Sequence, residues 1–524
     1  MKYRPFGLLA VLLTTVLCTQ TQAQNRPNII FILSDDHAYQ ATSAYGNKLV
    51  QTPNIDRIAN AGALLNNNFV ANSICGPSRA TLLTGKYSHK NGYTLNEKKY
   101  DVNQTNFPTL LQQGGYQTAW IGKLHLGSLP VGFDYFNILP GQGQYYNPEF
   151  INNQNDTIQY KGYVTNLISD FFFDWLQKRD TGKPFFAVVG EKATHREWLP
   201  DVQDLGAYDN IDFPLPDDFF DNYDTRLAAQ DQDMTIDKTM RLDFDLKVHQ
   251  KFGKALSASA GETPMAKYVN RSYGRLDDEQ AAAFEKYYGR ISDDFDARKL
   301  SGKELVKWKF QRYLKDYYAT AKSMDRNIGR ILDYLDSTGL SKNTVVIYAS
   351  DQGFYLGEHG WFDKRFIYEQ SLKTAFVARY PGVIKPGTKV DGFVSNVDWA
   401  PTILDLAGIK APADVQGRSF FPLLKGQLPK DWRKDVYYHY YEYPQPHHVS
   451  PHFGVRAKDF VLVRFYSGVE SWELFDLKKD PGEKRNVYGD VKYGKVVKEL
   501  KERLRRLIVE NDDKEALEVF NKEI

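Results

Sequence analysis

Cysteine is nearly absent from this chain of 524 residues, which contains only Cys18 and Cys75. An excess of charge of one sign is also lacking, because 67 lysines and arginines stand against 65 aspartates and glutamates. No block or stripe of basic residues interrupts that balance, so we expect no nucleic-acid partner. A framework of several disulfides is excluded, but 42% hydrophobic residues are enough for a large core.

Long hydrophobic runs are missing as well, apart from FGLLAVLLTTVL at residues 6–17. This run follows two basic residues and precedes a small-residue site at Ala23, an order typical of a cleaved signal peptide over residues 1–23. It is well short of the roughly 20 apolar residues that span a bilayer, so we expect no stable membrane span. A lipid anchor at Cys18 is less favoured, because the leucine before it is larger than the residue such sites prefer. We therefore expect a secreted or periplasmic protein in which Cys75 has no disulfide partner.

Apolar stretches rich in β-branched and aromatic residues recur between helical patterns. The stretches are NIIFIL (28–33), TAWIG (118–122), FFAVVG (185–190), TVVIYAS (344–350) and AFVARY (375–380). Continuous hydrophobic strands that alternate with helices predict an α/β fold, a large mostly parallel sheet sandwiched by helices. The clearest helix spans 317–340, where apolar residues fall on one stripe and Gly339 closes it.

Changes in this pattern divide the chain into regions. Residues 24–410 hold the alternating strands and helices and are expected to form a large N-terminal domain. Within it, about 201–310 lacks such strands and is dense in charged and aromatic residues. We expect a largely helical or irregular insertion there, which either overhangs one edge of the sheet or is simply solvated. Residues 411–524 change to short alternating strands followed by a Lys/Glu-rich helix, which predicts a smaller antiparallel sheet with a terminal helix.

Acidic and amide side chains follow two of the predicted strands at the points where they end. Asp35 and Asp36 come after the first strand, and Asp351 and Gln352 follow TVVIYAS. Ligands of open parallel sheets bind outside the carboxyl ends of the strands. One acidic pair alone is equally explained as a helix cap, but two pairs of oxygen ligands favour a hard cation. Such ligands suit Ca²⁺ or Mg²⁺ better than zinc.

Cys75 lies in SICGPSRATLLTG (73–85), where Pro77 and Arg79 follow it and a helix is expected to begin. This Cys-x-Pro-x-Arg pattern resembles the signature of the sulfatase family. Further segments resemble that family in the same order, from about residue 26 to 487. They are NIIFILSDDH, TPNIDRIANAGALLNNNFV, GKLHLG, KATHREWLP, YASDQGFYLGEHG, DKRFIYEQSLKTAFVARYPG and ELFDLKKDPGEKRNV.

The resemblance implies an alkaline phosphatase-like fold and a modified cysteine. Cys75 would be oxidised to the aldehyde formylglycine by a formylglycine-generating enzyme. The hydrated aldehyde carries two hydroxyls on one carbon, so it can expel sulfate by collapsing back to the aldehyde, whereas a sulfated serine would need a second attack by water. The resemblance also implies one Ca²⁺ ion, held by Asp35, Asp36, Cys75, Asp351 and Gln352. Gln352 stands where relatives often have Asn or His, which leaves the identity of the metal open.

The same resemblance assigns roles to five other residues. Lys123 and Lys364 would supply fixed positive charge to the sulfate oxygens, and Arg79 would orient the diol. A sugar alkoxide is a poor leaving group, so a general acid is needed at the bridging oxygen, and His195 is the candidate. His125 would be the base that triggers collapse of the diol. A lone histidine at a strand end is more often structural, but two histidines at family positions favour the catalytic interpretation.

The segments GWFDKRFIYE and YYEYPQPHHVSPHFGVRA most resemble the branch of sulfatases that removes 6-O-sulfate from N-acetylglucosamine or glucosamine. Asp363 and Arg365 flank Lys364 and are candidates to hold sugar hydroxyls. His447 and His452 are candidates to close the pocket, although ordinary loop or ion-pair roles explain all four nearly as well. The sulfated glycan substrate itself is not specified, because heparan-type chains, keratan-type chains and mucin glycans all carry this sugar.

Three alternatives stay open at this stage. Related folds hydrolyse phosphoryl or phosphonate esters, and a sulfatase could also act on another sulfate position. An inactive glycan-binding homologue is the non-enzymatic alternative, which the presence of every expected site residue disfavours.

Overall fold

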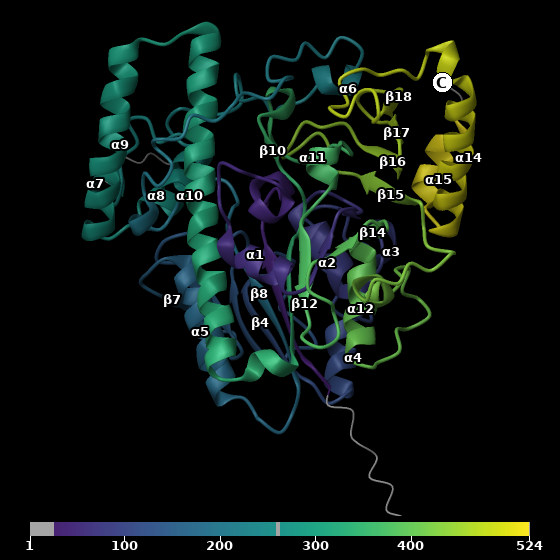
Figure 1. The fold of residues 1–524 in the computed structure, drawn as a ribbon. Coiled ribbons are helices and arrows are strands. Elements are labelled where there is room, and N and C mark those ends of the chain that lie inside the picture. Colours follow the sequence, from purple (N-terminus) through teal and green to yellow (C-terminus); the bar gives the residue numbers. More distant parts are fainter. Residues whose placement is uncertain (1–25, 258–262, 523–524) are drawn as a thin grey trace, which may run out of the picture.

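The computed structural model describes residues 26–257 and 263–522 and is shown in Figure 1. The signal peptide expected at residues 1–23 lies outside the described residues. Within the described ranges, no helix combines the length and the apolar composition that crossing a membrane requires.

A ten-stranded sheet forms the centre of the molecule, in the order β13-β2-β12-β9-β1-β8-β4-β5-β6-β7. The five strands from β9 to β5 are mutually parallel, which confirms the predicted mostly parallel sheet. The strand of AFVARY differs, because β12 pairs antiparallel with β9 and β2. The bounds are β1 (Asn28–Ser34), β2 (Ala63–Leu65), β4 (Gln117–Lys123), β5 (Tyr135–Leu139), β6 (Glu149–Asn152), β7 (Thr157–Gln159), β8 (Phe185–Gly190), β9 (Thr344–Ser350), β12 (Phe376–Arg379) and β13 (Thr388–Val390).

Helices cover both faces of this sheet, and β1 shows why its sequence is hydrophobic throughout. Ile30 and Ile32 belong to the core on one face, whereas Ile29, Phe31 and Leu33 belong to the core on the other. Successive side chains of a strand point to opposite faces, so a doubly covered strand has no polar side. The first face is covered by α1 (Pro53–Asn60), α5 (Val164–Lys178) and α10 (Gly302–Ser337), and the second by α2 (Cys75–Thr84), α4 (Phe107–Gln113) and α12 (Trp399–Leu406), as Figure 1 shows.

The longest helix, α10, begins 15 residues before the predicted start at 317 and ends two residues before Gly339, whose φ of 72° terminates it. Its second half carries the predicted apolar stripe, which packs on the sheet through residues such as Met324 and Ile328. Its first half packs elsewhere: Val306 and Phe310 contact a separate core with the insertion. The apolar stripe in the sequence therefore predicted only the half of α10 that packs on the sheet.

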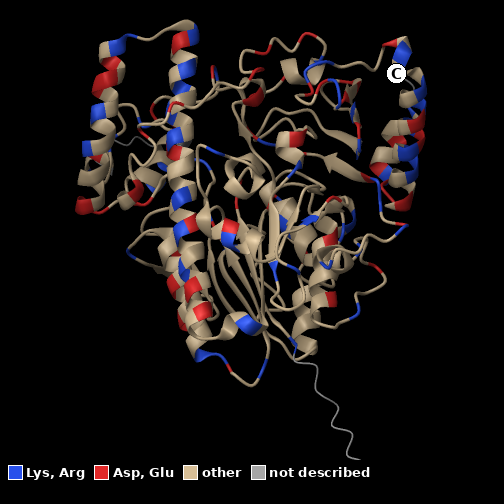
Figure 2. Ribbon diagram, viewed as in Figure 1, with Lys and Arg blue, Asp and Glu red and all other residues tan. Residues whose placement is uncertain are grey.

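Residues 201–310 form helices and irregular segments in the part that the structure describes. The helices are α6 (Leu227–Gln230), α7 (Lys254–Ser257), α8 (Pro264–Tyr273), α9 (Asp278–Arg298) and the start of α10. Bridges join Gln232 to Val449 and Thr235 to Trp361, so this segment touches both the C-terminal region and the chain before Lys364. Along α9 and α10, Lys and Arg alternate with Asp and Glu, without a band of one sign in Figure 2.

The C-terminal region contains the expected small antiparallel sheet, β15-β16-β17-β18, packed against terminal helices. Its elements are β15 (Asp435–Tyr440), β16 (His452–Ala457), β17 (Phe460–Phe465), β18 (Ser471–Asp476), α14 (Gly494–Glu510) and α15 (Lys514–Asn521). In Figure 1 this sheet and the insertion helices lie beyond the same end of the central sheet. The shorter elements are β3 (Asn68–Phe69), α3 (Ser88–Asn91), β10 (Tyr355–Leu356), β11 (Phe362–Asp363), α11 (Glu369–Leu372), β14 (Val394–Ser395) and α13 (Phe421–Leu424).

Candidate active site

Neighbouring parallel strands bring the predicted acidic residues together. Ser34 at the end of β1 pairs in register with Ser350 at the end of β9, so the residues that follow them emerge side by side. The main-chain N–H of Asp36 donates to Asp351 Oδ1 at 3.2 Å. Asp35, Asp36 and Asp351 each offer a carboxylate oxygen, and these oxygens lie within 4.8 Å of one another. The prediction that the strand ends meet is therefore confirmed.

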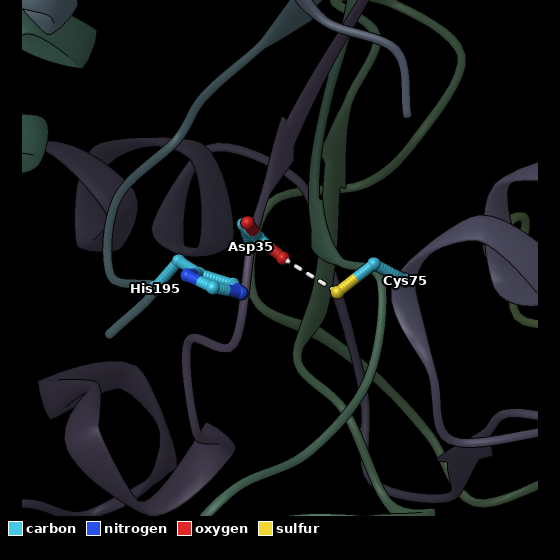
Figure 3. Close-up of side chains that lie close together, drawn as sticks. All are labelled: Asp35, Cys75 and His195. Atoms are coloured by element: carbon cyan, nitrogen blue, oxygen red, sulfur yellow. Dashed lines mark hydrogen bonds between the residues drawn. The ribbon is translucent and has the colours of Figure 1, made fainter. Parts of the chain in front are cut away.

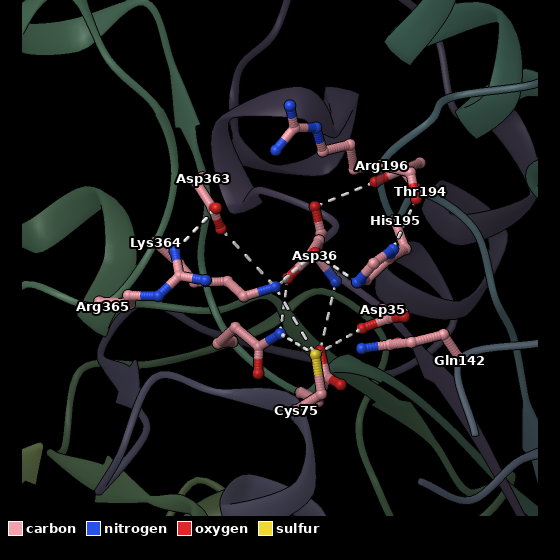
Figure 4. A network of polar contacts seen from close by, with 12 residues as sticks. Asp35, Asp36, Cys75, Gln142, Thr194, His195, Arg196, Asp363, Lys364 and Arg365 are labelled. Carbon is pink, nitrogen blue, oxygen red and sulfur yellow. Dashed lines mark hydrogen bonds and ion pairs between the residues drawn. The ribbon is translucent and has the colours of Figure 1, made fainter. Parts of the chain in front are cut away.

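Cys75 is the first residue of α2 and lies beside this cluster. Its Sγ is 3.2 Å from Asp35 Oδ1, 3.3 Å from Gln352 Nε2 and 3.6 Å from Lys364 Nζ. Figure 4 shows Cys75 together with Asp35 and Lys364. The side chain is only 1% exposed. Burial and the charge of Asp35 raise the pKa of the thiol well above its usual range. The lone cysteine thus lies at a helix N-terminus among charged groups. A cysteine that served only as a small buried hydrophobic residue would lie in an apolar core instead.

The donor set fits a hard cation. Three carboxylates crowd together in a buried site, where unpaired negative charge is costly. Burial raises the pKa of Asp36 although Lys364 opposes it, and burial with the charge of Asp35 raises the pKa of Asp351 to about 7. The Oε1 atom of Gln352 is buried without a hydrogen-bond partner among the described residues. A Ca²⁺ ion would supply a partner for that oxygen and bind the clustered carboxylates.

Two lysines carry positive charge into the acidic cluster. Lys364 Nζ lies 2.6 Å from each carboxylate oxygen of Asp36. Lys123, the last residue of β4, forms a buried ion pair with Asp35 and also donates to Gln142 Oε1 at 2.6 Å. Burial alone would raise the pKa of Asp35, but Lys123 and the other cationic groups nearby hold it well below its usual range. Both lysines therefore bring fixed positive charge into the cluster beside Cys75.

Arg79 lies one turn after Cys75 on α2, and therefore on the same face of that helix. Its Nε donates to Asp351 Oδ2 at 2.9 Å and its Nη1 donates to the Lys123 carbonyl at 2.7 Å. Its Nη2 is buried without a partner among the described residues. Arg79 thus joins α2 to the ends of β9 and β4 and keeps one donor free.

The two candidate histidines lie at the same end of the sheet. His195 Nε2 is 4.0 Å from Asp36 Oδ2, and its Nδ1 contacts the Arg196 carbonyl at 2.6 Å. Figure 3 shows His195 on the opposite side of Asp35 from Cys75. His125 is partly buried, and its Nδ1 has no partner among the described residues. Burial, reinforced by Lys123, holds the pKa of both imidazoles well below the usual range, so both are neutral before an anion enters.

Asp363, the last residue of β11, and Arg365 flank Lys364. Arg365 Nη1 lies 2.7 Å from Asp363 Oδ2, and both residues have positive φ, 82° and 97°. Burial lowers the pKa of His447 to about 3, and the charges of Arg365 and Asp363 also act on it. His447 therefore lies within electrostatic range of the two charged residues that flank Lys364.

His452 is placed differently from the other candidates. It is fully buried in β16, with its ring 5.7 Å from that of Phe366. The N–H of Ile367 donates to its Nε2 at 3.1 Å, and its Nδ1 contacts the Ser450 carbonyl at 2.9 Å. Both ring nitrogens are thus used by the main chain. This geometry argues against the expected contact with substrate and gives His452 the role of supporting the segment after Lys364.

Sequence patterns missed three residues of this network. Gln142 contacts Lys123, Thr194 Oγ1 donates to the Asp36 carbonyl at 2.9 Å, and Glu442 Oε1 lies 3.8 Å from Arg365 Nε while fully buried. The glycines of PGQGQ were the only sequence signal for Gln142. Thr194 and Glu442 lie in the quoted segments KATHREWLP and YYEYPQPHHVSPHFGVRA, but neither was singled out as a candidate.

Comparisons with known proteins agree with this geometry. A family model described as Sulfatase matches residues 27–409, and one described as N-sulphoglucosamine sulphohydrolase, C-terminal, matches residues 357–510. An N-acetylglucosamine-6-O-sulfatase of Bacteroides thetaiotaomicron is 45% identical over 95% of this chain and 90% of its own length. The N-acetylglucosamine-6-sulfatase of Homo sapiens is 26% identical over 79% of this chain and 67% of its own.

Solved structures give the same result. One protein in complex with its substrate D-glucosamine-2-N,6-O-disulfate has a TM-score of 0.90 and 44% identity, covering 95% of this chain and all of that one. The phosphonate monoester hydrolase of Agrobacterium radiobacter has a TM-score of 0.65 at 20% identity, covering 93% and 96%, which shows the fold alone.

Proposed function

This chain belongs to the sulfatase family and is a sulfuric ester hydrolase, and from that premise we propose that it removes 6-O-sulfate from N-acetylglucosamine or glucosamine residues of glycosaminoglycan or mucin glycans. The observation that carries the proposal is the grouping of Asp363, Lys364 and Arg365 beside Cys75, in a chain 44% identical to a protein solved with a 6-O-sulfated glucosamine.

Two groups would be supplied from outside the chain. A formylglycine-generating enzyme would oxidise Cys75, and the hydrated aldehyde would provide a hydroxyl nucleophile with a second hydroxyl through which sulfate can be released. A Ca²⁺ ion held by Asp35, Asp36, Asp351, Gln352 and the modified Cys75 would lower the pKa of a neighbouring hydroxyl. The buried, unpartnered Gln352 oxygen and the three clustered carboxylates support this assignment.

The side chains around Cys75 then handle charge and protons. Lys123 and Lys364 would hold the sulfate oxygens, since both ammonium groups already lie within the cluster. His195 would protonate the bridging oxygen of the sugar, because a sugar alkoxide leaves poorly without a proton. The anionic sulfate favours protonation of that imidazole by placing negative charge beside it. His125 would accept a proton from the nucleophilic side of the site.

Recognition of the sugar would come from the segment that carries Lys364. Asp363 and Arg365 present an acceptor and several donors on either side of the sulfate-binding lysine, and their charges act on His447. Hydroxyls of a sugar whose 6-sulfate contacts Lys364 would lie within reach of such groups. Such hydrogen bonds distinguish sugars strongly, because a missing hydroxyl leaves buried polar groups unpaired.

We also propose that the protein acts outside the cytoplasm, in the periplasm or after secretion. The basic residues, apolar run and small-residue site at the N-terminus support this location.

The decisive experiment is a screen of sulfate release from defined 6-O-, 4-O-, 3-O-, 2-O- and N-sulfated monosaccharides. The protein should be produced with a formylglycine-generating enzyme, and Cys75→Ala serves as the matched control. We expect release from 6-O-sulfated glucosamines alone and no release by the control. The mass of the Cys75 peptide reports the modification independently, because oxidation to the aldehyde lowers it. Release only from another position, or undiminished release by Cys75→Ala, would overturn the proposal.

A further inference from the structure

One buried contact of the active site has no place in the chemistry above. Lys123 donates to two side chains, the carboxylate of Asp35 and the amide oxygen of Gln142, which it contacts at 2.6 Å. Figure 4 shows Gln142 on the same side of Cys75 as Asp35, across from Asp363. The two acceptors differ in charge: the carboxylate neutralises the ammonium, and the amide does not.

The fold places Gln142 beside Lys123 through strand pairing. Lys123 and Leu139 are register partners at the carboxyl ends of the parallel strands β4 and β5. Pro140 follows directly, and the N–H of Gly143 donates to its carbonyl at 3.0 Å, which closes a turn around Gln142. The loop that carries Gln142 therefore begins next to the catalytic lysine.

The two glycines that flank Gln142 fix its direction. Gly141 and Gly143 have φ of 57° and 68°, a left-handed conformation that side chains rarely adopt. A Cβ at Gly143 would also lie only 2.7 Å from Leu139 Cδ1. Residue 142 is thus held between two positions that require glycine.

Further contacts tie this loop to the rest of the site. Lys192, which is 1% exposed, donates from Nζ to the Gln142 carbonyl at 3.4 Å and lies 4.6 Å from the centre of the Tyr145 ring. The Tyr145 hydroxyl donates to the His195 carbonyl at 2.6 Å. One loop therefore contacts both Lys123 and the segment that carries the candidate acid.

We propose that Gln142 is a positioning residue that holds the Lys123 ammonium in place, without neutralising its charge, for the sulfate of the substrate. The inference rests on the proposed function, because it requires a sulfate at this site. A neutral acceptor suits this role, because it accepts one ammonium proton without adding a second negative charge beside Lys123 that would oppose an incoming anion. A glutamate of the same shape would pair with Lys123 and compete with the sulfate.

The test compares Gln142→Glu and Gln142→Leu with the wild type, and with Gln154→Ala as a control in an exposed turn. Three quantities are measured: kcat/KM for a 6-O-sulfated glucosamine between pH 5 and 8, the rise in melting temperature caused by inorganic sulfate, and the melting temperature itself. We expect kcat/KM to fall about 10- to 100-fold in both Gln142 variants, the usual cost of losing a supporting contact. The Gln154→Ala variant should match the wild type.

Two readouts separate positioning from a merely structural role. The Gln142→Glu variant should recover toward wild-type activity as the pH falls, because protonation makes the new side chain neutral, whereas Gln142→Leu should not recover. Both variants should lose the stabilisation by sulfate. Without sulfate, their melting temperatures should equal that of the wild type. Activity within about twofold of wild type and unchanged stabilisation by sulfate would overturn the proposal.

The same measurements distinguish this inference from the proposed function. If the wild type binds inorganic sulfate but hydrolyses no sulfated sugar, the function is wrong, and the sulfate-induced melting shifts of the variants still decide the role of Gln142. If sulfate stabilises none of the proteins, the role of Gln142 in holding Lys123 for a sulfate is overturned, and sulfate release from the sugars still decides the proposed function.

Discussion

The Nε atom of Arg79 lies 2.9 Å from Asp351 Oδ2, and the two side chains are 0% and 1% exposed. This ion pair connects the helix that begins at Cys75 to the strand end that supplies two of the five candidate cation ligands. The position of Cys75 relative to that ligand cluster is therefore fixed by a contact within the chain.

Removal of the arginine should destabilise the fold as well as the site. Arg79→Ala leaves Asp351 buried without its partner, a change that typically costs about 3–5 kcal/mol. Urea unfolding measures the effect. The matched control is Arg57→Ala, because Arg57 is 37% exposed and pairs with Asp333 at the surface, where about 0–1 kcal/mol is expected. Equal stabilities of the two variants would contradict the structural role of the buried pair.

Divalent cations should stabilise the folded protein and be required for activity. Binding of Ca²⁺ to the folded state alone adds about 2.7 kcal/mol at a hundred times the dissociation constant. The melting temperature should fall on chelation and return with Ca²⁺, and Asp351→Asn should weaken this response. Asp333→Asn, at an exposed carboxylate, should respond like the wild type. Indifference of both activity and melting temperature to chelation would rule out the cation.

The two histidines should differ in their dependence on the leaving group. His195→Ala should lower kcat for sugar sulfates by about 10²- to 10⁴-fold, with a smaller loss for an aryl sulfate whose phenolate leaves without a proton. His125→Ala should lower both rates alike. The surface residue His249, whose side chain is 59% exposed, provides the control variant His249→Ala. An equal loss on both substrates in His195→Ala would remove it as the general acid.

Sugar recognition should depend on Arg365 and His447 without affecting small substrates. A hydrogen bond to a charged group contributes about 1.5–3 kcal/mol, so Arg365→Lys should raise KM for a sugar sulfate roughly 10- to 150-fold. KM for an aryl sulfate should hardly change. His447→Ala tests the same point without disturbing the Asp363 ion pair. If KM rises equally for both substrates, these residues serve the sulfate and not the sugar.

Acid should destabilise the fold partly through His452. Burial lowers the pKa of this imidazole from 6.5 to about 3 in the folded protein. Below about pH 6.5 the unfolded chain takes up a proton that the folded protein refuses, so stability is complete above 6.5 and falls as the pH drops toward 3. One such group contributes about 1.4 kcal/mol per pH unit over that window. Urea unfolding at pH 7 and pH 5 should show a smaller difference in His452→Phe than in the wild type, whereas an identical difference would contradict the assignment.

The strands of the central sheet were predictable because a strand that is buried on both faces is hydrophobic at consecutive positions. The stretch at 28–33 is apolar at every position after Asn28, since both faces of β1 are covered, and β1 spans Asn28–Ser34. The direction of β12 was not predictable, because an apolar strand has the same composition in either orientation. The first half of α10 was missed for a related reason, since it packs against the insertion and not against the sheet.

By itself, the sequence determined the chemical inventory of this protein: one lone cysteine ahead of an arginine, acidic pairs after two hydrophobic strands, and the motifs that identify its family. Tertiary structure alone decided which polar groups share a site. Gln142 reaches Lys123 through the register of β4 and β5, and Glu442 reaches Arg365 from the loop between β15 and β16, whereas both ring nitrogens of His452 bind the main chain. The physical reason is that contacts between distant segments follow from strand pairing and packing. A short stretch of sequence does not show which distant segment it will contact.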